Sequence, residues 1–92
     1  MNLSFAPAAL ADLKKIRAWI AEDDASAADR VVARIRQTIL MLEAFPLLGR
    51  PGLVQGTRQL SVAGLPYFVV YKLVSDTELV ILAILHGRRK YP

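Results

Sequence analysis

The stretch YFVVYKLVSDTELVILAIL, at residues 67–85, decides the fold of this 92-residue chain. Its first part, 67–74, is rich in β-branched and aromatic residues and is apolar on both faces apart from Lys72. The short polar run 75–77 predicts a hairpin turn. The run 79–85 is again apolar on both faces, as expected of a strand buried on both sides. The stretch therefore predicts an antiparallel pair of strands, with the second strand central in its sheet.

Two further strands are predicted upstream of this pair. Polar and apolar residues alternate over 58–62, with Arg58 at the mouth of the apolar side. They alternate again at the N-terminus, where Leu3 and Phe5 are the apolar residues. The segment 46–57 holds two prolines and three glycines, so we expect a loop there.

A first helix is predicted to follow the N-terminal strand. Pro7 suits the first helical position, where its missing N–H costs nothing. The apolar residues that follow recur at steps of three and four, the spacing of one buried helix face. They are Leu10, Leu13, Ile16 and Ile20. We expect these four side chains to form the buried face of the helix.

A second helix is predicted after the acidic run 22–24. Ser26 and Asp29 stand three residues apart, the spacing of a capping box at a helix start. Apolar residues then recur at helical spacing as far as Leu42. Phe45 precedes Pro46, and a residue before proline disfavours helical backbone, so the helix should end there. Joined by a short polar turn, the two helices should form an antiparallel hairpin.

The order of elements is therefore one strand, two helices and three strands joined by short turns. Helices segregated from an antiparallel sheet define an α+β fold. We predict an N-terminal strand, an antiparallel two-helix hairpin and a C-terminal three-stranded antiparallel sheet. A chain of this length forms a single domain, residues 1–92.

The composition points to a binding partner. Hydrophobic residues make up 54% of the chain and the mean hydropathy is +0.35, against roughly 45–50% apolar residues in ordinary soluble domains. Apolar surface that stays outside commonly marks the footprint of a partner, although a high alanine content would raise the same figure. The formal net charge of +4 favours an acidic partner or a phosphate backbone.

Composition also excludes several classes of protein. The chain has no cysteine, which rules out disulfide scaffolds and thiolate metal sites and suits a reducing cytosol. No carboxylates cluster near its one histidine, His86, so we expect neither a metal nor a cofactor. The N-terminus lacks a signal-peptide pattern, and the longest apolar run is far shorter than the ~20 residues that span a bilayer. We therefore expect a cytoplasmic protein without membrane attachment.

Candidate functional residues stand at the ends of the predicted strands and in the tail. They are Arg58, His86, Arg88, Arg89, Lys90 and Tyr91. A ribonuclease that uses the 2′-hydroxyl needs groups that move protons and cations that stabilise the phosphorane charge. His86 or Tyr91 could transfer protons. Arg58 with Arg88 or Arg89 could hold the phosphate. We expect these features to converge on one face of the sheet.

Each candidate also has a purely structural interpretation. A histidine at the end of a strand is commonly hydrogen-bonded at the sheet edge, and Arg58 could pair with a carboxylate. Tyr91 could pack its ring and leave its hydroxyl in water, and a basic terminus could simply be solvated. The residue types suit nuclease chemistry, but their spacing alone does not establish it.

Four features, in order along the chain, resemble the RelE/ParE superfamily of bacterial toxins. They are the order of elements, the segment FPLLGRP (45–51), the strands that contain RQL (58–60) and YFVVY (67–71), and the closing ILHGRR (84–89). The resemblance implies the toxin of a type II toxin–antitoxin system, which inhibits growth and stabilises plasmids.

The superfamily divides by target, and the resemblance favours its ParE branch. RelE-like members cut messenger RNA on the ribosome with charged residues in their middle strands, whereas ParE-like members share the fold and poison DNA gyrase. Arg50 is the only charged residue between positions 46 and 57, so the lysine-rich or glutamate-bearing stretch of a RelE-type nuclease is missing. We therefore expect a gyrase inhibitor rather than an enzyme.

Two alternatives stay open. Arg58, His86, Arg88 and Tyr91 could still form a reduced catalytic site for messenger RNA on the ribosome. The chain could instead be an inactive member that only binds its antitoxin and represses their shared operon.

The resemblance also implies contact residues. Contacts to the target are expected from all the candidates named above, from Arg58 to Tyr91. The partner would be a cognate antitoxin with a DNA-binding N-terminal part and an acidic, amphipathic C-terminal segment that folds as it binds, giving a hetero-oligomer. Its footprint is expected on the helical hairpin and the adjoining sheet edge, at Leu13, Arg17, Ile20 and Arg34.

Overall fold

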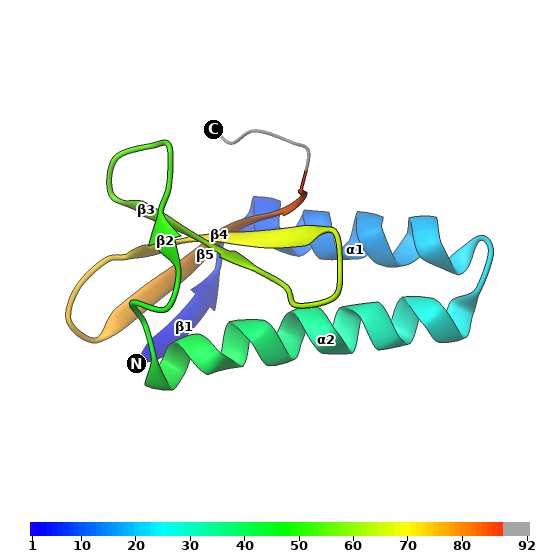
Figure 1. Cartoon of the computed structure of the whole chain (residues 1–92), viewed down its shortest axis with the longest axis horizontal. Coiled ribbons are helices and arrows are strands. Elements are labelled where there is room, and N and C mark those ends of the chain that lie inside the picture. Colours follow the sequence, from blue (N-terminus) through cyan, green and yellow to red (C-terminus); the bar gives the residue numbers. More distant parts are fainter. Residues whose placement is uncertain (88–92) are drawn as a thin grey trace.

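The computed structural model describes residues 1–87, and its elements follow the predicted order with one addition. The elements are β1 (Asn2–Phe5), α1 (Pro7–Ala21), α2 (Ala25–Ala44), β2 (Arg50–Pro51), β3 (Thr57–Ser61), β4 (Tyr67–Leu73) and β5 (Glu78–His86). The two helices run antiparallel as a hairpin, and the turn between them extends well beyond the sheet (Figure 1). The predicted α+β class and the predicted helical hairpin are therefore confirmed.

The strands form one five-stranded mixed sheet in the order β1-β5-β4-β3-β2. Strands β3, β4 and β5 are the predicted antiparallel unit, and β5 has neighbours on both sides as its sequence predicted. The predicted sheet had three strands, whereas the observed sheet has five. The two additional strands are β1, which pairs with β5 in parallel, and β2, which lies within the predicted loop 46–57 and pairs with β3. Pro51 is tolerated in β2 because an edge strand can lack a ladder N–H.

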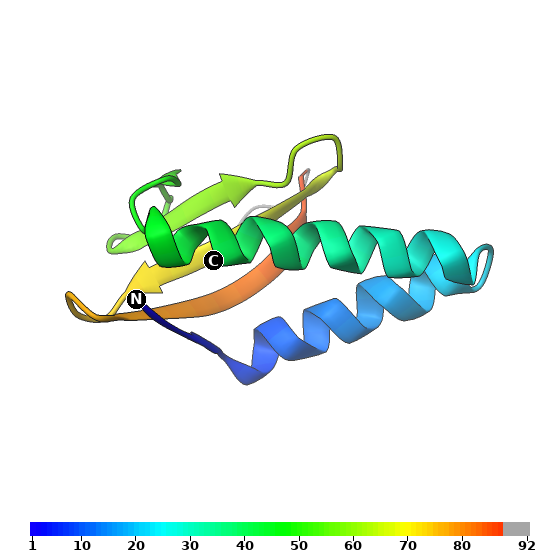
Figure 2. The same cartoon turned by 90° about the horizontal axis from the view of Figure 1, so that it is seen from below.

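The two faces of the sheet differ in what covers them. On one face, Leu13 of α1 and Ile35 of α2 share a core with Tyr71 of β4. On the other face, a smaller cluster centred on Phe68 and Val70 is made entirely of β4 and β5 residues. Seen from below, α2 crosses directly in front of the sheet and α1 runs beside it (Figure 2). We call these the helix-covered face and the helix-free face.

The buried face of α1 contains the predicted Leu13 and Ile16, but it begins at Ala9 and not at Leu10. Ala9 is fully buried and Leu13 is 5% exposed, whereas Leu10 is 46% exposed. Ile16 is partly buried and packs against the same core. At about 3.6 residues per turn, positions 9, 13 and 16 fall on one side of a helix. Leu10 was therefore wrongly placed in the buried face, because the small Ala9 takes the position against the sheet.

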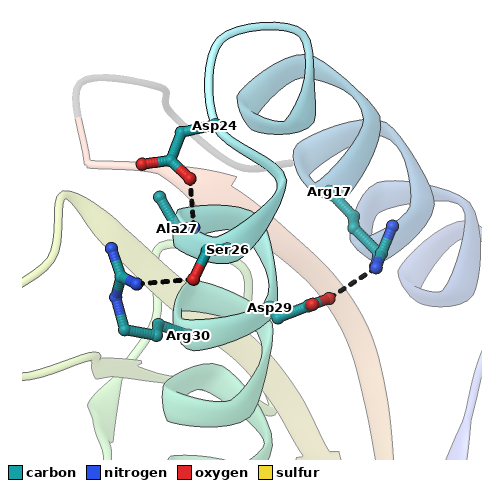
Figure 3. Close-up of polar contacts among 6 residues, drawn as sticks. All are labelled: Arg17, Asp24, Ser26, Ala27, Asp29 and Arg30. Carbon is teal, nitrogen blue, oxygen red and sulfur yellow. Dashed lines mark hydrogen bonds and ion pairs between the residues drawn. The ribbon is translucent and has the colours of Figure 1, made fainter.

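The start of α2 is capped by Asp24, and not by the predicted Ser26. The Asp24 side chain accepts a hydrogen bond from the backbone N–H of Ala27 at 3.0 Å (Figure 3). Ser26 lies inside the first turn of the helix. Asp29 forms no capping box, because its carboxylate pairs with Arg17 of α1 instead (Figure 3). The acidic run therefore supplies the cap, and Asp29 ties the two helices together.

Candidate functional site

A β-bulge in β5 decides which face His86 occupies. The register between β4 and β5 shifts in mid-strand, leaving Leu82 without an opposite residue. Ile84 packs in the core of the helix-covered face, whereas Leu82 packs on the helix-free cluster. His86 lies two residues beyond Ile84 and beside α1. Simple alternation along the strand predicts one side for Leu82, Ile84 and His86, but Leu82 lies on the other side because the bulge inverts the alternation.

The second half of β5 is attached to α1 by a carboxylate. Asp12 Oδ2 accepts a hydrogen bond from the backbone N–H of Ile84 at 2.9 Å. Strand β1 pairs only with residues 78–81 of β5, so this N–H has no strand partner on that edge. Asp12 therefore provides the acceptor for a backbone N–H at an open strand edge, and it fixes α1 beside His86.

A shallow groove lies between α1 and the end of β5. Its volume is about 290 Å³, and its lining residues are Asp12, Lys15, Ile16, Trp19, Tyr67, Ile84, Leu85 and His86. The ring of His86 meets that of Tyr67 edge-on, with 5.8 Å between the ring centroids. Trp19 is 69% exposed. The groove therefore offers apolar surface beside the basic side chain of Lys15.

Arg58 holds the segment that precedes β2. Its guanidinium donates a hydrogen bond to the carbonyl of Gly49 at 2.6 Å. The hydroxyl of Tyr71 accepts from the N–H of Gly49 at 2.9 Å and donates to the carbonyl of Pro46 at 2.8 Å. A Cβ at Gly49 would come within 2.7 Å of the Tyr71 ring, so only glycine fits. We call this set of contacts the loop clamp.

Burial keeps the Tyr71 hydroxyl protonated within the loop clamp. Burial raises the pKa of Tyr71 above its ordinary value, while the hydrogen bond from Gly49 and the positive charge of Arg58 act in the opposite direction. At neutral pH the hydroxyl can therefore donate to Pro46 while it accepts from Gly49.

The structure does not bring Arg58 and His86 together. Both lie on the helix-covered side, but Arg58 pairs with Tyr71 and His86 with Tyr67, four residues apart along β4. With a rise of about 3.3 Å per residue and about 4.8 Å between strands, their Cα atoms are roughly 16 Å apart. Fully buried Val69 lies between these two β4 residues. Arg58 and His86 therefore share one face of the sheet as expected but stand apart on it, and the candidates at positions 88–91 lie outside the described residues.

A second cavity opens on the helix-free face, where the sequence pattern predicted none. Its volume is about 500 Å³, and its lining residues are Arg50, Pro51, Leu53, Gln59, Ser61, Leu65, Pro66, Tyr67, Phe68 and Gly87. Arg50 is exposed and stands opposite Gln59 in the β2–β3 register. A two-residue strand shows no alternation, so only the lone charge in the loop could have drawn attention to Arg50. We call this cavity the Arg50 cleft.

Residues 1–87 lack two kinds of feature. No helix in this part of the chain combines the length and hydropathy needed to cross a bilayer. Nor does it contain a group of three His, Cys, Asp or Glu side chains able to hold a metal ion.

Comparison with known proteins assigns the fold to a family. The family model described as the ParE toxin of the type II toxin–antitoxin system parDE matches residues 3–91. The chain belongs to this ParE toxin family. Y4kP of Sinorhizobium fredii, a candidate toxin, is 42% identical over 84 residues, which cover 91% of this chain and 85% of that protein. A solved structure of the chromosomal ParDE toxin–antitoxin system from P. aeruginosa matches with a TM-score of 0.81 and 27% identity, over 94% of this chain and 95% of that one.

Membership of the ParE family implies an antitoxin partner. Of the four residues expected in its footprint, Leu13 lies in the core and is 5% exposed, so its assignment to a binding surface is corrected. Arg17 is exposed and paired with α2, and Ile20 is partly buried at the end of α1. Arg34 is exposed and donates to the carbonyl of Ala63 at 2.9 Å. These three keep some surface that an antitoxin could contact.

Proposed function

We propose that this ParE-type toxin binds and inhibits DNA gyrase, and that a cognate antitoxin neutralises it by binding it in the cytoplasm. Membership of the ParE family supports the toxin role. The placement of Arg58 is the observation that favours a binding function over RNA cleavage. A nuclease needs its proton-transfer groups and its cations around one phosphodiester, whereas Arg58 stands roughly 16 Å from His86 between Cα atoms and its guanidinium is turned to Gly49.

The bonding of Arg58 also favours this proposal. Its guanidinium is partly buried and donates to Gly49 within the loop clamp. Turning it towards an RNA phosphate would break this bond and leave a carbonyl without its charged donor. Arg58 is therefore better suited to hold the loop than to stabilise a transition state, and of the two described candidates only His86 keeps a contact role in this proposal.

The basic residues 88–90 supply the main target contacts in this proposal, with Tyr91 beside them. Their charge suits an acidic surface on gyrase. Replacing Arg88, Arg89 and Lys90 together by alanine should abolish inhibition of supercoiling by purified gyrase. The matched control replaces Lys14, Arg30 and Arg36, which removes the same charge from the exposed helix surfaces and should leave inhibition intact. Full activity of the tail variant would remove the tail from the proposal.

Pulse-labelling of DNA and protein synthesis after induction without antitoxin tests the target. If the proposal holds, DNA synthesis falls first and translation follows late. Translation that stops within minutes while DNA synthesis continues would point to ribosome-dependent RNA cleavage, and Arg58→Ala and His86→Ala should then abolish it. Growth without any defect would instead favour an inactive member that serves only as a co-repressor.

The groove between α1 and β5 is the most suitable surface for the antitoxin in this proposal. An acidic, amphipathic segment would place apolar side chains against Trp19 and carboxylates near Lys15 and Arg17. Ile20 and Arg34 would lie at the margins of the same footprint. Trp19 is the only tryptophan of the chain, so its fluorescence reports on this surface directly.

Purified cognate antitoxin should shift Trp19 emission to shorter wavelength as the indole leaves water. Trp19→Ala should weaken the complex at least tenfold, because exposed aromatic side chains are common centres of binding energy. Val74→Ala removes another exposed apolar side chain, 54% exposed, from the turn between β4 and β5, outside both the groove and the Arg50 cleft, and serves as the control. Equal affinity of the Trp19 variant and the wild type would place the antitoxin elsewhere.

A further inference from the structure

We propose that the Arg50 cleft is a recognition site for an acidic segment of the target protein, with Arg50, Gln59 and Ser61 binding a carboxylate. This inference rests on the proposed function, because it assigns part of the target contact to a surface distinct from the basic tail. No pattern in the sequence predicts this cleft, since it is assembled from β2, β3, the start of β4 and Gly87 beyond β5.

Arg50 is held on a fixed backbone. It directly follows Gly49, whose N–H and carbonyl are both bonded within the loop clamp. On its other side, Gly52 donates to the carbonyl of Thr57 at 2.8 Å, and Arg50 itself pairs with Gln59 across the two strands. A guanidinium on such a backbone loses less conformational freedom on binding than one on a free loop. The loop clamp therefore positions Arg50 for a ligand.

The charges around the cleft favour an anionic ligand. The chain has eight acidic residues, all of them within the described residues 1–87, and none of the eight lines the cleft. Arg50 therefore has no carboxylate of its own chain in the cavity. The amide of Gln59 and the hydroxyl of Ser61 add uncharged donors. A carboxylate suits this set, because a guanidinium can bind both of its oxygens at once.

The rest of the lining favours a polypeptide over a nucleic acid. A phosphate backbone is bound by several cations spaced along a groove, whereas Arg50 is the one cation among the described lining residues. Bases bind by stacking on exposed aromatic rings, but Phe68 is only 9% exposed. Leu53, which is 74% exposed, and Pro51 instead offer contacts to apolar side chains that flank a carboxylate. An acidic protein segment with apolar neighbours fits both halves of the lining.

Charge reversal at Arg50 tests the site on the full-length toxin with purified gyrase. Arg50→Glu should weaken binding at least tenfold, and Arg50→Lys should restore part of that loss, because lysine keeps the charge without the planar fork. Arg36→Glu makes the same change at another exposed arginine, on α2, and should bind as the wild type does. Thermal unfolding of all three variants should match the wild type, which separates loss of contact from loss of fold.

Two results would overturn the inference while leaving the gyrase proposal intact. One is wild-type affinity for gyrase in Arg50→Glu. The other is obtained with a photo-crosslinking residue in place of Ser61: in poisoned cells, it would crosslink to DNA or RNA rather than to protein. If the wild-type toxin fails to bind gyrase, the proposed function fails instead. The cleft would still stand if that crosslinker labels an acidic segment of another protein and Arg50→Glu abolishes the labelling.

Discussion

Arg58 and Arg50 belong to adjacent strands, yet they lie on opposite faces of the sheet and have different surroundings. On the helix-covered face, Arg58, Tyr71 and Asp12 each bond to main-chain atoms of their own chain. On the helix-free face, Arg50 lines an open cleft together with Gln59. Polar groups under the helices are therefore used to hold the fold, and those on the open face remain available to a partner. The face of the sheet on which an arginine lies therefore decides whether it holds the fold or is available to a partner.

The largest expected effect lies at the centre of the loop clamp. In Gly49→Ala the new Cβ would stand 2.7 Å from the Tyr71 ring and 2.8 Å from the carbonyl of Gln59. We expect a loss of about 3 kcal/mol in the free energy of unfolding, typical of an overpacked site, measured by chemical denaturation. Gly56→Ala is the control, since it has open space and bears only the strain of a positive φ of 85°, roughly 1 kcal/mol. Equal losses in the two variants would mean that the clamp is not tightly packed.

Tyr71→Phe removes both hydrogen bonds of the hydroxyl and keeps the ring. The N–H of Gly49 and the carbonyl of Pro46 then lose their partner. Leaving such buried groups unsatisfied should cost about 2 kcal/mol. Phe68→Tyr serves as the opposite control, because it adds a hydroxyl on the helix-free face near the cleft and should change stability much less. An unchanged free energy of unfolding in Tyr71→Phe would contradict the stabilising role of the loop clamp.

The same variant has a pH signature. Because the pKa of Tyr71 is raised in the fold, its contribution to stability is complete below the ordinary tyrosine pKa of about 10. Above that pH the unfolded chain loses this proton first, so stability falls by up to about 1.4 kcal/mol per pH unit until the folded pKa is passed. The difference in unfolding free energy between wild type and Tyr71→Phe should therefore shrink above pH ~10. A constant difference would contradict the raised pKa.

Sequence patterns predicted the helical hairpin and the three antiparallel strands because each rests on local periodicity. They missed β2 because two residues have no period, and they gave no partner to β1 because pairing across the chain is not a local property. The bulge in β5 was equally invisible, since every residue of 79–85 is apolar. The cap of α2 was misplaced because Asp24 and Ser26 both suit a helix start. Only the backbone conformation distinguishes them, since Asp24 is extended and Ser26 is already helical.

The candidate site was predicted less well, for a physical reason. Arg58 and His86 were singled out by residue type, but the sheet register sets their partners four residues apart along β4. Arg50 was noted only as a lone charge, and its cleft depends on the loop clamp. The clamp itself joins Gly49 to Tyr71 across 22 residues of sequence. No pattern within one element could reveal it.

The next prediction concerns the carboxylate that attaches α1 to β5. Asp12→Ala would leave the Ile84 N–H at an open strand edge without its acceptor, at a cost of about 1–2 kcal/mol. Asp12→Asn keeps a side-chain oxygen in the same place and should recover most of that loss. Hydrogen exchange should be faster at the Ile84 amide in the alanine variant alone. Equal exchange in both variants would show that water replaces the carboxylate without cost.

The smallest expected effect is also the most direct test of the difference between the two faces. Arg58→Gln should lower the free energy of unfolding by roughly 1 kcal/mol, because it removes a charged donor from Gly49. Arg50→Gln, on the exposed edge strand, should stay within about 0.5 kcal/mol of wild type. Toxicity should follow the reverse order, with Arg50→Gln the weaker toxin. Stability and toxicity respond to different variants because Arg58 holds a loop, whereas Arg50 binds a ligand in this proposal. An Arg58→Gln toxin that is stable but harmless would reverse the assignment and restore Arg58 as a nuclease candidate.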